Sequence, residues 1–193
     1  MIEIRVHRIL EQTKMAGPGL RFCLWVQGCS RKCKGCAAKE TWSFDGGTAI
    51  NIDQIFILIK NTLHIEGVTF LGGEPFEQAE SLAELAYKIK SIGLSVVTFS
   101  GYIYDDLISL KDNNIKRLLS YTDLLIDGAF VEEKFDLSRP WVGSSNQKYN
   151  FLTNRYTQND LCNIHNQLEI RISPNGKATI NGMGNFEQVK KFL

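Results

Sequence analysis

Gly28-Cys29-Ser30-Arg31-Lys32-Cys33-Lys34-Gly35-Cys36 places three of the chain's five cysteines within eight residues. The three thiolates of this stretch, here called the cysteine loop (residues 28–36), are close enough in sequence to bind one inorganic centre. A disulfide would use two sulfurs and leave the third cysteine without a purpose. Structural zinc sites and ordinary iron–sulfur electron carriers both use four protein ligands. Three cysteines in one loop therefore predict a cluster with one iron left open for a substrate.

Composition limits the class of protein. The 193 residues carry 22 Lys and Arg against 21 Asp and Glu, a net charge of +1, which favours neither a nucleic-acid surface nor an acidic tail. Residues 1–7 alternate apolar and charged side chains, unlike a signal peptide, and no later apolar run is long enough for a membrane span. We expect a cytoplasmic protein with no nucleic-acid or membrane partner. In a reducing compartment its cysteines indicate metal chemistry rather than disulfides.

Apolar periodicity predicts alternating strands and helices, followed by a hairpin. Strands are expected at residues 2–8, 20–26, 68–71, 94–99 and 123–127. Helices are expected at residues 52–63, 77–92 and 104–119, the last with a break near Asn113-Asn114. Asn51 is a plausible helix cap, and Gly93 ends the second helix. Residues 168–172 and 177–181 form the predicted β-hairpin, and a short C-terminal helix follows it.

Strands joined by helices of this length build a parallel sheet, which makes the fold α/β. In such sheets, ligands bind beyond the carboxyl ends of the strands. The segments that follow strands here are the cysteine loop, Gly72–Pro75, Ser100-Gly101-Tyr102 and Asp127-Gly128. We therefore expect all four to lie on one rim, which is the predicted active site.

These motifs resemble those of the radical S-adenosylmethionine (SAM) superfamily, in which Cys-x3-Cys-x2-Cys follows a strand and Gly-Gly-Glu-Pro follows the next one. More narrowly, residues 16–147 are similar to the family of activating proteins of anaerobic ribonucleotide reductase. The further motifs that carry this resemblance, in the order of that family, are Gly17-Pro18-Gly19, Thr41-Trp42, Ser100-Gly101-Tyr102, Asp127-Gly128 and Gly143-Ser144-Ser145-Asn146-Gln147.

The resemblance implies a fold and a division of the chain. The fold is an incomplete, TIM-like β/α barrel of the radical SAM type, with a C-terminal β-hairpin extension. Residues 1–150 would form the barrel core, and residues 151–193 an extension packed on it.

The resemblance also implies the cofactors. Cys29, Cys33 and Cys36 would each bind one iron of a 4Fe–4S cluster, and the amino and carboxylate groups of SAM would chelate the fourth iron. The remaining residues expected to bind the cofactor are Gly72, Gly73, Glu74, Pro75, Ser100, Gly101, Tyr102 and Asp127.

The roles expected of these residues differ. The two glycines let the backbone approach the methionine part of SAM, and Glu74 or its neighbouring carbonyls accept from the ammonium group. Pro75 fixes the turn, while Ser100 and the Gly101-Tyr102 backbone lie within reach of the carboxylate or the ribose.

The implied activity is that of an activase. It cleaves SAM reductively to a 5′-deoxyadenosyl radical, which generates a glycyl radical on a large partner enzyme, here anaerobic ribonucleotide reductase. A low-potential protein such as flavodoxin would donate the electron. One alternative is a radical SAM enzyme that modifies a small molecule or a peptide. The other is a non-catalytic iron–sulfur or zinc module with Cys23 or Cys162 as fourth ligand, although we interpret both as non-ligands.

The chain departs from the family pattern at two places. Ala37-Ala38 stands where the family has an aromatic or polar pair, which affects how the adenine is covered. Val142 stands where the family has an arginine before Gly143.

Overall fold

The main feature of the computed structural model is one seven-stranded sheet; the structure describes residues 2–176 and 178–184. The strands lie in the order β3-β1-β2-β4-β5-β6-β7. β2, β4, β5 and β6 pair in parallel, whereas β1, β3 and β7 pair antiparallel to their neighbours. The strand bounds are β1 Glu3–Thr13, β2 Arg21–Val26, β3 Thr48–Asn51, β4 Gly67–Gly72, β5 Ser95–Phe99, β6 Leu124–Asp127 and β7 Lys148–Phe151.

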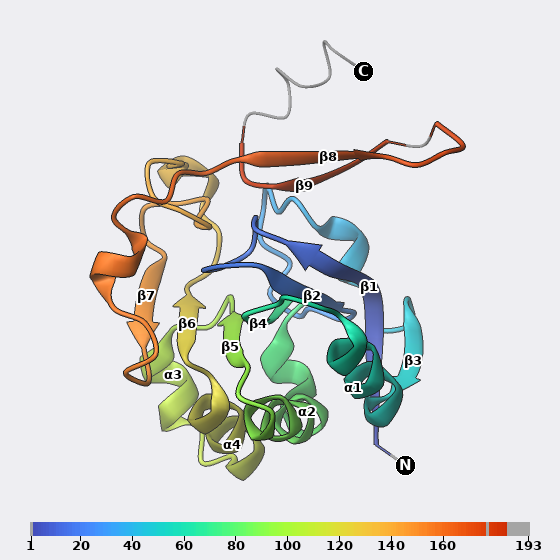
Figure 1. Ribbon diagram of the computed structural model, residues 1–193. Coiled ribbons are helices and arrows are strands. Elements are labelled where there is room, and N and C mark those ends of the chain that lie inside the picture. The colour runs from blue at the N-terminus through green and yellow to red at the C-terminus, as the bar shows by residue number, and fades with distance from the viewer. Residues whose placement is uncertain (1, 177, 185–193) are drawn as a thin grey trace.

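The helices lie on one side of this sheet, and a two-stranded hairpin lies on the other side (Figure 1). The helix bounds are α1 Ile52–Asn61, α2 Ala79–Ser91, α3 Tyr104–Ser109 and α4 Asn113–Tyr121. The hairpin consists of β8 (Leu168–Ile172) and β9 (Ala178–Gly182), which confirms the predicted hairpin. The C-terminal helix predicted after it lies among residues 185–193, outside the described residues.

The predicted helices are present, and their ends differ from the predicted ones by at most two residues. The Asn51 side chain accepts from the Asp53 N–H at the start of α1. The predicted break in the third helix is real, because Asp112 caps a separate helix, α4, by accepting from the N–H groups of Asn114 and Ile115. Gly93 follows α2 with φ +81°, the left-handed conformation that favours glycine.

The four strands that the predicted helices join are parallel, as expected, but the sequence analysis did not predict the edges of the sheet. The first strand runs on to Thr13 and pairs antiparallel with β2, because no helix separates the two strands in sequence. β3 and β7 were not predicted at all. Each has four residues with no buried side chain, so neither carries the apolar alternation that marks a strand.

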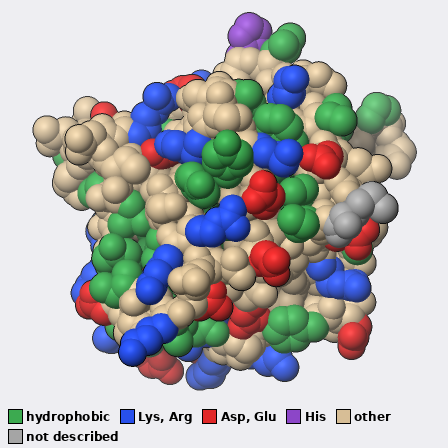
Figure 2. Space-filling model, turned by 90° about the horizontal axis from the view of Figure 1, so that it is seen from below, with side chains coloured by type: hydrophobic (Ala, Val, Ile, Leu, Met, Phe, Trp, Pro, Cys, Tyr) green, Lys and Arg blue, Asp and Glu red, His purple; other side chains and the backbone are tan. Residues whose placement is uncertain are grey.

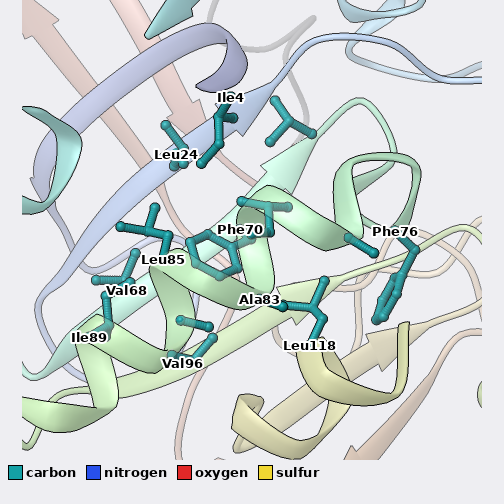
Figure 3. Close-up of a cluster of buried hydrophobic side chains, with 14 of the residues drawn as sticks. Ile4, Leu24, Val68, Phe70, Phe76, Ala83, Leu85, Ile89, Val96 and Leu118 are labelled. Carbon is teal, nitrogen blue, oxygen red and sulfur yellow. The ribbon is translucent and has the colours of Figure 1, made fainter. Parts of the chain in front are cut away.

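The main hydrophobic core lies between the sheet and the helices (Figure 3). Phe70 of β4 and Leu24 of β2 pack there against Leu85 of α2, and all three side chains are fully buried. A second cluster occupies the opposite face of β5 and β6. It brings Tyr156 and Leu161, from beyond β7, against the sheet, and its buried members are Val97, Leu124, Ile126, Trp141, Val142, Tyr156 and Leu161.

Arg21, at the start of β2, is a fully buried cation. Its guanidinium donates to Thr69 Oγ1 at 2.6 Å, to the Val68 carbonyl at 2.7 Å and to the Tyr156 hydroxyl at 3.1 Å. Burial lowers the pKa of this guanidinium, although the nearby Tyr156 favours the charged form. The network ties the segment after β7 to the beginning of the parallel strands.

Charges of both signs cover the helix side of the molecule. Figure 2, seen from below, shows Lys and Arg side chains intermingled with Asp and Glu and with hydrophobic side chains on this face. Among the described helices, none is long and apolar enough to cross a membrane.

Candidate functional site

The loops that follow the four parallel strands meet at one rim of the sheet. Gly73 N–H donates to the Val26 carbonyl and Glu74 N–H to the Gly28 carbonyl, each at 2.8 Å. Gly101 N–H donates to Glu74 Oε2 at 2.7 Å, and the loop after β6 joins through Gly128 N–H and the Tyr102 carbonyl at 3.1 Å. The structure thus brings together the four segments that the sequence places after strands.

The cysteine loop is held by a strap, defined here as residues 39–46. Gly28 N–H donates to the Thr41 carbonyl at 2.8 Å, and Cys29 N–H donates to the Trp42 carbonyl at 3.2 Å. The loop turns sharply at Lys32, which has φ +42°, and again at Gly35, with φ +77°. These turns place three cysteines on a short stretch of chain whose first residues are hydrogen-bonded to the strap.

All three cysteines of the loop are free thiols, and they differ in how far they are exposed to solvent. Cys29 is 9% exposed, and Cys33 and Cys36 are partly exposed. Burial raises the pKa of the Cys29 thiol, and the backbone N–H groups of Lys32 and Arg31 oppose that rise. Ala38 N–H points to Cys36 Sγ at 3.4 Å. Backbone N–H groups aimed at sulfur match the surroundings that stabilise iron–sulfur clusters.

The described residues contain no site for a single metal ion. In residues 2–176 and 178–184, no three His, Cys, Asp or Glu side chains come close enough together to hold one metal ion. The cysteines of a 4Fe–4S cluster need not converge on one ion, because each binds a separate iron and they lie farther apart than the four ligands of a zinc ion.

The two other cysteines lie away from the loop. Cys23 is fully buried in β2, beside Ala16 and Trp25, and burial raises its pKa to about 12, so it remains a neutral thiol. Cys162 is exposed at the end of a short helical turn, where its thiol donates to the Gln158 carbonyl at 3.4 Å. Neither cysteine is placed to complete a four-ligand site.

The Gly72–Pro75 segment lies directly against the cysteine loop. Gly72 has φ +104°, and a Cβ added to Gly73 would lie 2.2 Å from the Gly28 carbonyl oxygen. Only glycine permits this approach of two backbones. Pro75 is buried and opens the 3-10 helix η2 (Pro75–Gln78).

The Glu74 side chain is used inside the protein. It is 1% exposed and accepts from Ser100 Oγ at 3.0 Å, from Gly101 N–H at 2.7 Å and from Phe76 N–H at 3.1 Å. Burial raises the pKa of this carboxyl to about 7 in spite of those three donors. These three donors engage both oxygens of the Glu74 carboxylate within the protein.

The polar atoms of Tyr102 and Asp127 have different partners. The Tyr102 hydroxyl lies 3.4 Å from Ser30 Oγ of the cysteine loop. Asp127 is 2% exposed, and its Oδ2 accepts from Tyr104 N–H at 2.6 Å. Since Ile126 faces away from the helices and side chains alternate along a strand, Asp127 faces α3 and supports its first turn. Its Oδ1 has no hydrogen-bond partner among the described residues.

Sequence reasoning missed two side chains that tie the rim together. Gln78 Nε2 donates to the carbonyls of Arg5 and Gln27, each at 2.9 Å, and its Oε1 accepts from Arg5 N–H at 2.8 Å. Glu77 reaches the cysteine loop at Ser30. The only signal in the sequence was their position, in the turn directly after Gly-Gly-Glu-Pro.

Comparison with known proteins agrees with this geometry. A family model described as a 4Fe-4S single cluster domain matches residues 15–150. The chain is 34% identical to the anaerobic ribonucleoside-triphosphate reductase-activating protein of Haemophilus influenzae, covering 68% of this chain and 87% of that protein. It is 35% identical to the activating protein of the same name from Pasteurella multocida, covering 74% and 91%.

Among solved structures, QueE from Escherichia coli is similar over 52% of this chain and 54% of that one, with a TM-score of 0.44 and 18% identity. At that degree of likeness, the fold assignment rests on the strands and helices of this chain alone.

Proposed function

Because this chain belongs to the family of anaerobic ribonucleoside-triphosphate reductase-activating proteins, we propose that it is the radical SAM activase of a glycyl-radical enzyme, most simply an anaerobic ribonucleotide reductase. Its cofactors are a 4Fe–4S cluster and SAM. When bound, the reduced cluster supplies the electron that cleaves SAM to methionine and a 5′-deoxyadenosyl radical, which then removes a hydrogen atom from a glycine of the partner.

The contact between the two glycine-containing loops carries this proposal. The Gly28 carbonyl accepts from Glu74 N–H at 2.8 Å, and Gly73 approaches the same peptide too closely for any side chain. The loop assigned to the cluster and the loop assigned to SAM therefore share one rigid peptide. This coupling is what a site needs if the substrate is to become a ligand of the cluster.

The chain's own residues bind and orient in this proposal. Cys29, Cys33 and Cys36 hold the cluster. Glu74 fixes the loop after β5 through Ser100 and Gly101, so that backbone groups of adjacent loops face the ligand in a set arrangement. We assign the SAM contacts to the backbone of residues 72–75 and 100–102.

We propose that the fold is the incomplete β/α barrel of the radical SAM type. The parallel strands β2, β4, β5 and β6, with helices on one side, support it, as do end strands that pair only with their inner neighbours in the described sheet. Residues 1–150 would be the barrel core and residues 151–193 its extension. We place the protein in the cytoplasm, with a low-potential donor such as flavodoxin.

The test is anaerobic turnover. The protein is loaded with iron and sulfide, given dithionite and SAM, and assayed for 5′-deoxyadenosine by chromatography. Wild type and Cys162→Ala form the product, because Cys162 is exposed and outside the loop, while Cys33→Ala forms none. Adding the reductase then produces a glycyl radical that electron paramagnetic resonance detects. Cluster-loaded wild type that makes no 5′-deoxyadenosine even with the reductase present would refute the proposal.

One observation favours the alternative that the substrate is a small molecule or a peptide. In a β/α barrel the helices form the outer ring, so the face that Tyr156 and Leu161 cover would be the barrel interior. The segment after residue 150 thus occupies space near β5 and β6 that a large partner would otherwise reach. Product formed without any glycyl radical on the reductase would favour this alternative.

A further inference from the structure

Glu77 joins three loops of the rim through one carboxylate. It lies in η2, two residues after the proline of Gly-Gly-Glu-Pro, and accepts from Ser30 N–H at 3.1 Å through Oε1 and at 3.2 Å through Oε2. The Ser30 hydroxyl also donates to Glu77 Oε1. The Tyr102 hydroxyl, in the loop after β5, lies 3.4 Å from the same oxygen.

The position of Ser30 gives these contacts their significance. Ser30 follows Cys29 directly, so a carboxylate that holds the Ser30 peptide also limits where the Cys29 thiol lies. Arg31, the next residue, places its guanidinium 4.9 Å above the ring of Tyr102, on the loop that Glu77 also contacts. The beginning of the cysteine loop is therefore held from two sides, by an anion on η2 and by an aromatic ring after β5.

A carboxylate suits this position better than a neutral group. Two oxygens accept from the single N–H and the hydroxyl of Ser30, and hydrogen bonds to an ionised acceptor are about twice as strong as neutral ones. Backbone hydrogen bonds to residues 41 and 42 hold Gly28 and Cys29, but they do not extend to Ser30. Glu77 extends that hold into the part of the loop between Cys29 and Cys33.

We propose, on the premise of the radical SAM activity above, that Glu77 is a positioning residue. It fixes the first turn of the cysteine loop against the Gly-Gly-Glu-Pro loop and Tyr102, so that the cluster and the SAM site keep one mutual position. Glu77 touches neither the cluster nor SAM in this role, because its carboxylate is used by Ser30 and Tyr102.

The test compares Glu77→Ala and Glu77→Gln with Glu80→Gln, an exposed glutamate in the first turn of α2 whose loss changes the net charge equally. Hydrogen exchange of the Ser30 amide, in protein without iron, measures the hold directly. Glu77→Ala raises that exchange rate about tenfold, because one charge-assisted hydrogen bond is lost, whereas Glu80→Gln leaves it unchanged.

The second measurement is the dissociation constant of SAM for the iron-loaded protein. Glu77→Ala binds cluster iron as wild type does, since all three cysteines remain, but its SAM affinity falls about tenfold. Glu77→Gln keeps one acceptor oxygen, so its SAM affinity lies between those of wild type and Glu77→Ala. Circular dichroism on the same samples verifies that each variant is folded.

The outcomes separate the two proposals. If exchange at Ser30 rises while SAM affinity stays unchanged, Glu77 is a structural contact only and the positioning role is overturned. Unchanged exchange overturns it as well, because the contact then holds nothing. If wild type itself binds no SAM, the proposed function fails together with this inference, whereas equal binding by wild type and Glu77→Ala rejects only the inference.

Discussion

Replacing Gly73 by alanine tests the contact on which the site depends. The new Cβ would lie 2.2 Å from the Gly28 carbonyl oxygen and 2.9 Å from its carbonyl carbon, where ordinary contact begins at 3.4 Å. Both neighbours are backbone atoms, so no side chain can swing away. To reach ordinary contact, the Gly28 and Gly73 backbones must separate by about 1 Å.

Two effects add to the cost of this substitution. Overpacking of this kind costs about 1–3 kcal/mol, and the hydrogen bond from Glu74 N–H to the Gly28 carbonyl, worth about 1 kcal/mol, is stretched or lost. Cys29 follows Gly28 directly, so its thiol moves relative to the other two. We expect Gly73→Ala to lower the free energy of unfolding by about 2–4 kcal/mol and to weaken the binding of cluster iron about tenfold.

Gly93→Ala is the matched control. Gly93 has φ +81°, and a Cβ added there would have no other atom within 4 Å, so alanine costs about 1–2 kcal/mol of left-handed backbone strain without touching the rim. Urea unfolding of the iron-free proteins, followed by circular dichroism, gives the stabilities. The amount of iron per chain after anaerobic reconstitution measures how well the three cysteines hold the cluster. If Gly73→Ala retains as much iron as Gly93→Ala, the contact between the two loops does not position the cysteines and the reasoning is refuted.

Three further predictions concern single groups. Burial raises the pKa of Glu74 from 4.5 to about 7. The neutral carboxyl therefore contributes to the free energy of unfolding below about pH 4.5, and this contribution is lost as pH rises through about 7. Urea titrations should show up to about 3 kcal/mol lost by iron-free wild type between about pH 4 and pH 8, and little by Glu74→Gln; parallel profiles would contradict this. Tyr156→Phe removes the hydroxyl bonded to Arg21 and should cost about 1–2 kcal/mol in urea unfolding with iron content unchanged, so an equal stability would argue against the network. Iodoacetamide should label exposed Cys162 in the folded protein and leave buried Cys23 unlabelled until denaturant is added, as mass spectrometry can verify.

The parallel part of the fold was predictable because each of its strands is a short apolar run bounded by turn residues. Residues 67–72 illustrate this, because the first four of them, Gly67 to Phe70, are buried. The sequence signal fails where a strand buries only part of itself. β7 pairs with β6 along its whole length, yet its residues Lys148-Tyr149-Asn150-Phe151 include none that is fully buried. Such a strand forms because β6 offers it backbone hydrogen-bond partners. The residues of β7 alone therefore do not predict it.

The site was predictable to the level of its loops but less so to the level of side chains. Cysteine spacing and the position of glycines after strands located the rim. The different roles of Glu74 and Glu77 could not be told from the sequence, since both are acidic residues in the same turn. Only the folded chain places Glu74 against Ser100 inside the protein and Glu77 against Ser30 outside it.

Asp127 and the hairpin illustrate why the sequence could not show which face of a strand is turned inward. Period-two alternation assigns side chains to two faces but does not say which face is turned inward. Asp127 was predicted to contact the cofactor, and its Oδ2 accepts from Tyr104 N–H at the start of α3. In β8, Glu169 accepts from Thr13 Oγ1 of β1 at 2.8 Å, while Ile172 on the alternate face is 70% exposed. The polar face is the inner one there because its neighbour is the polar end of β1. Which face is buried is therefore a property of the neighbouring element, and motif reasoning succeeds only where, as at the cysteine loop, the chemistry belongs to the backbone and to residues adjacent in sequence.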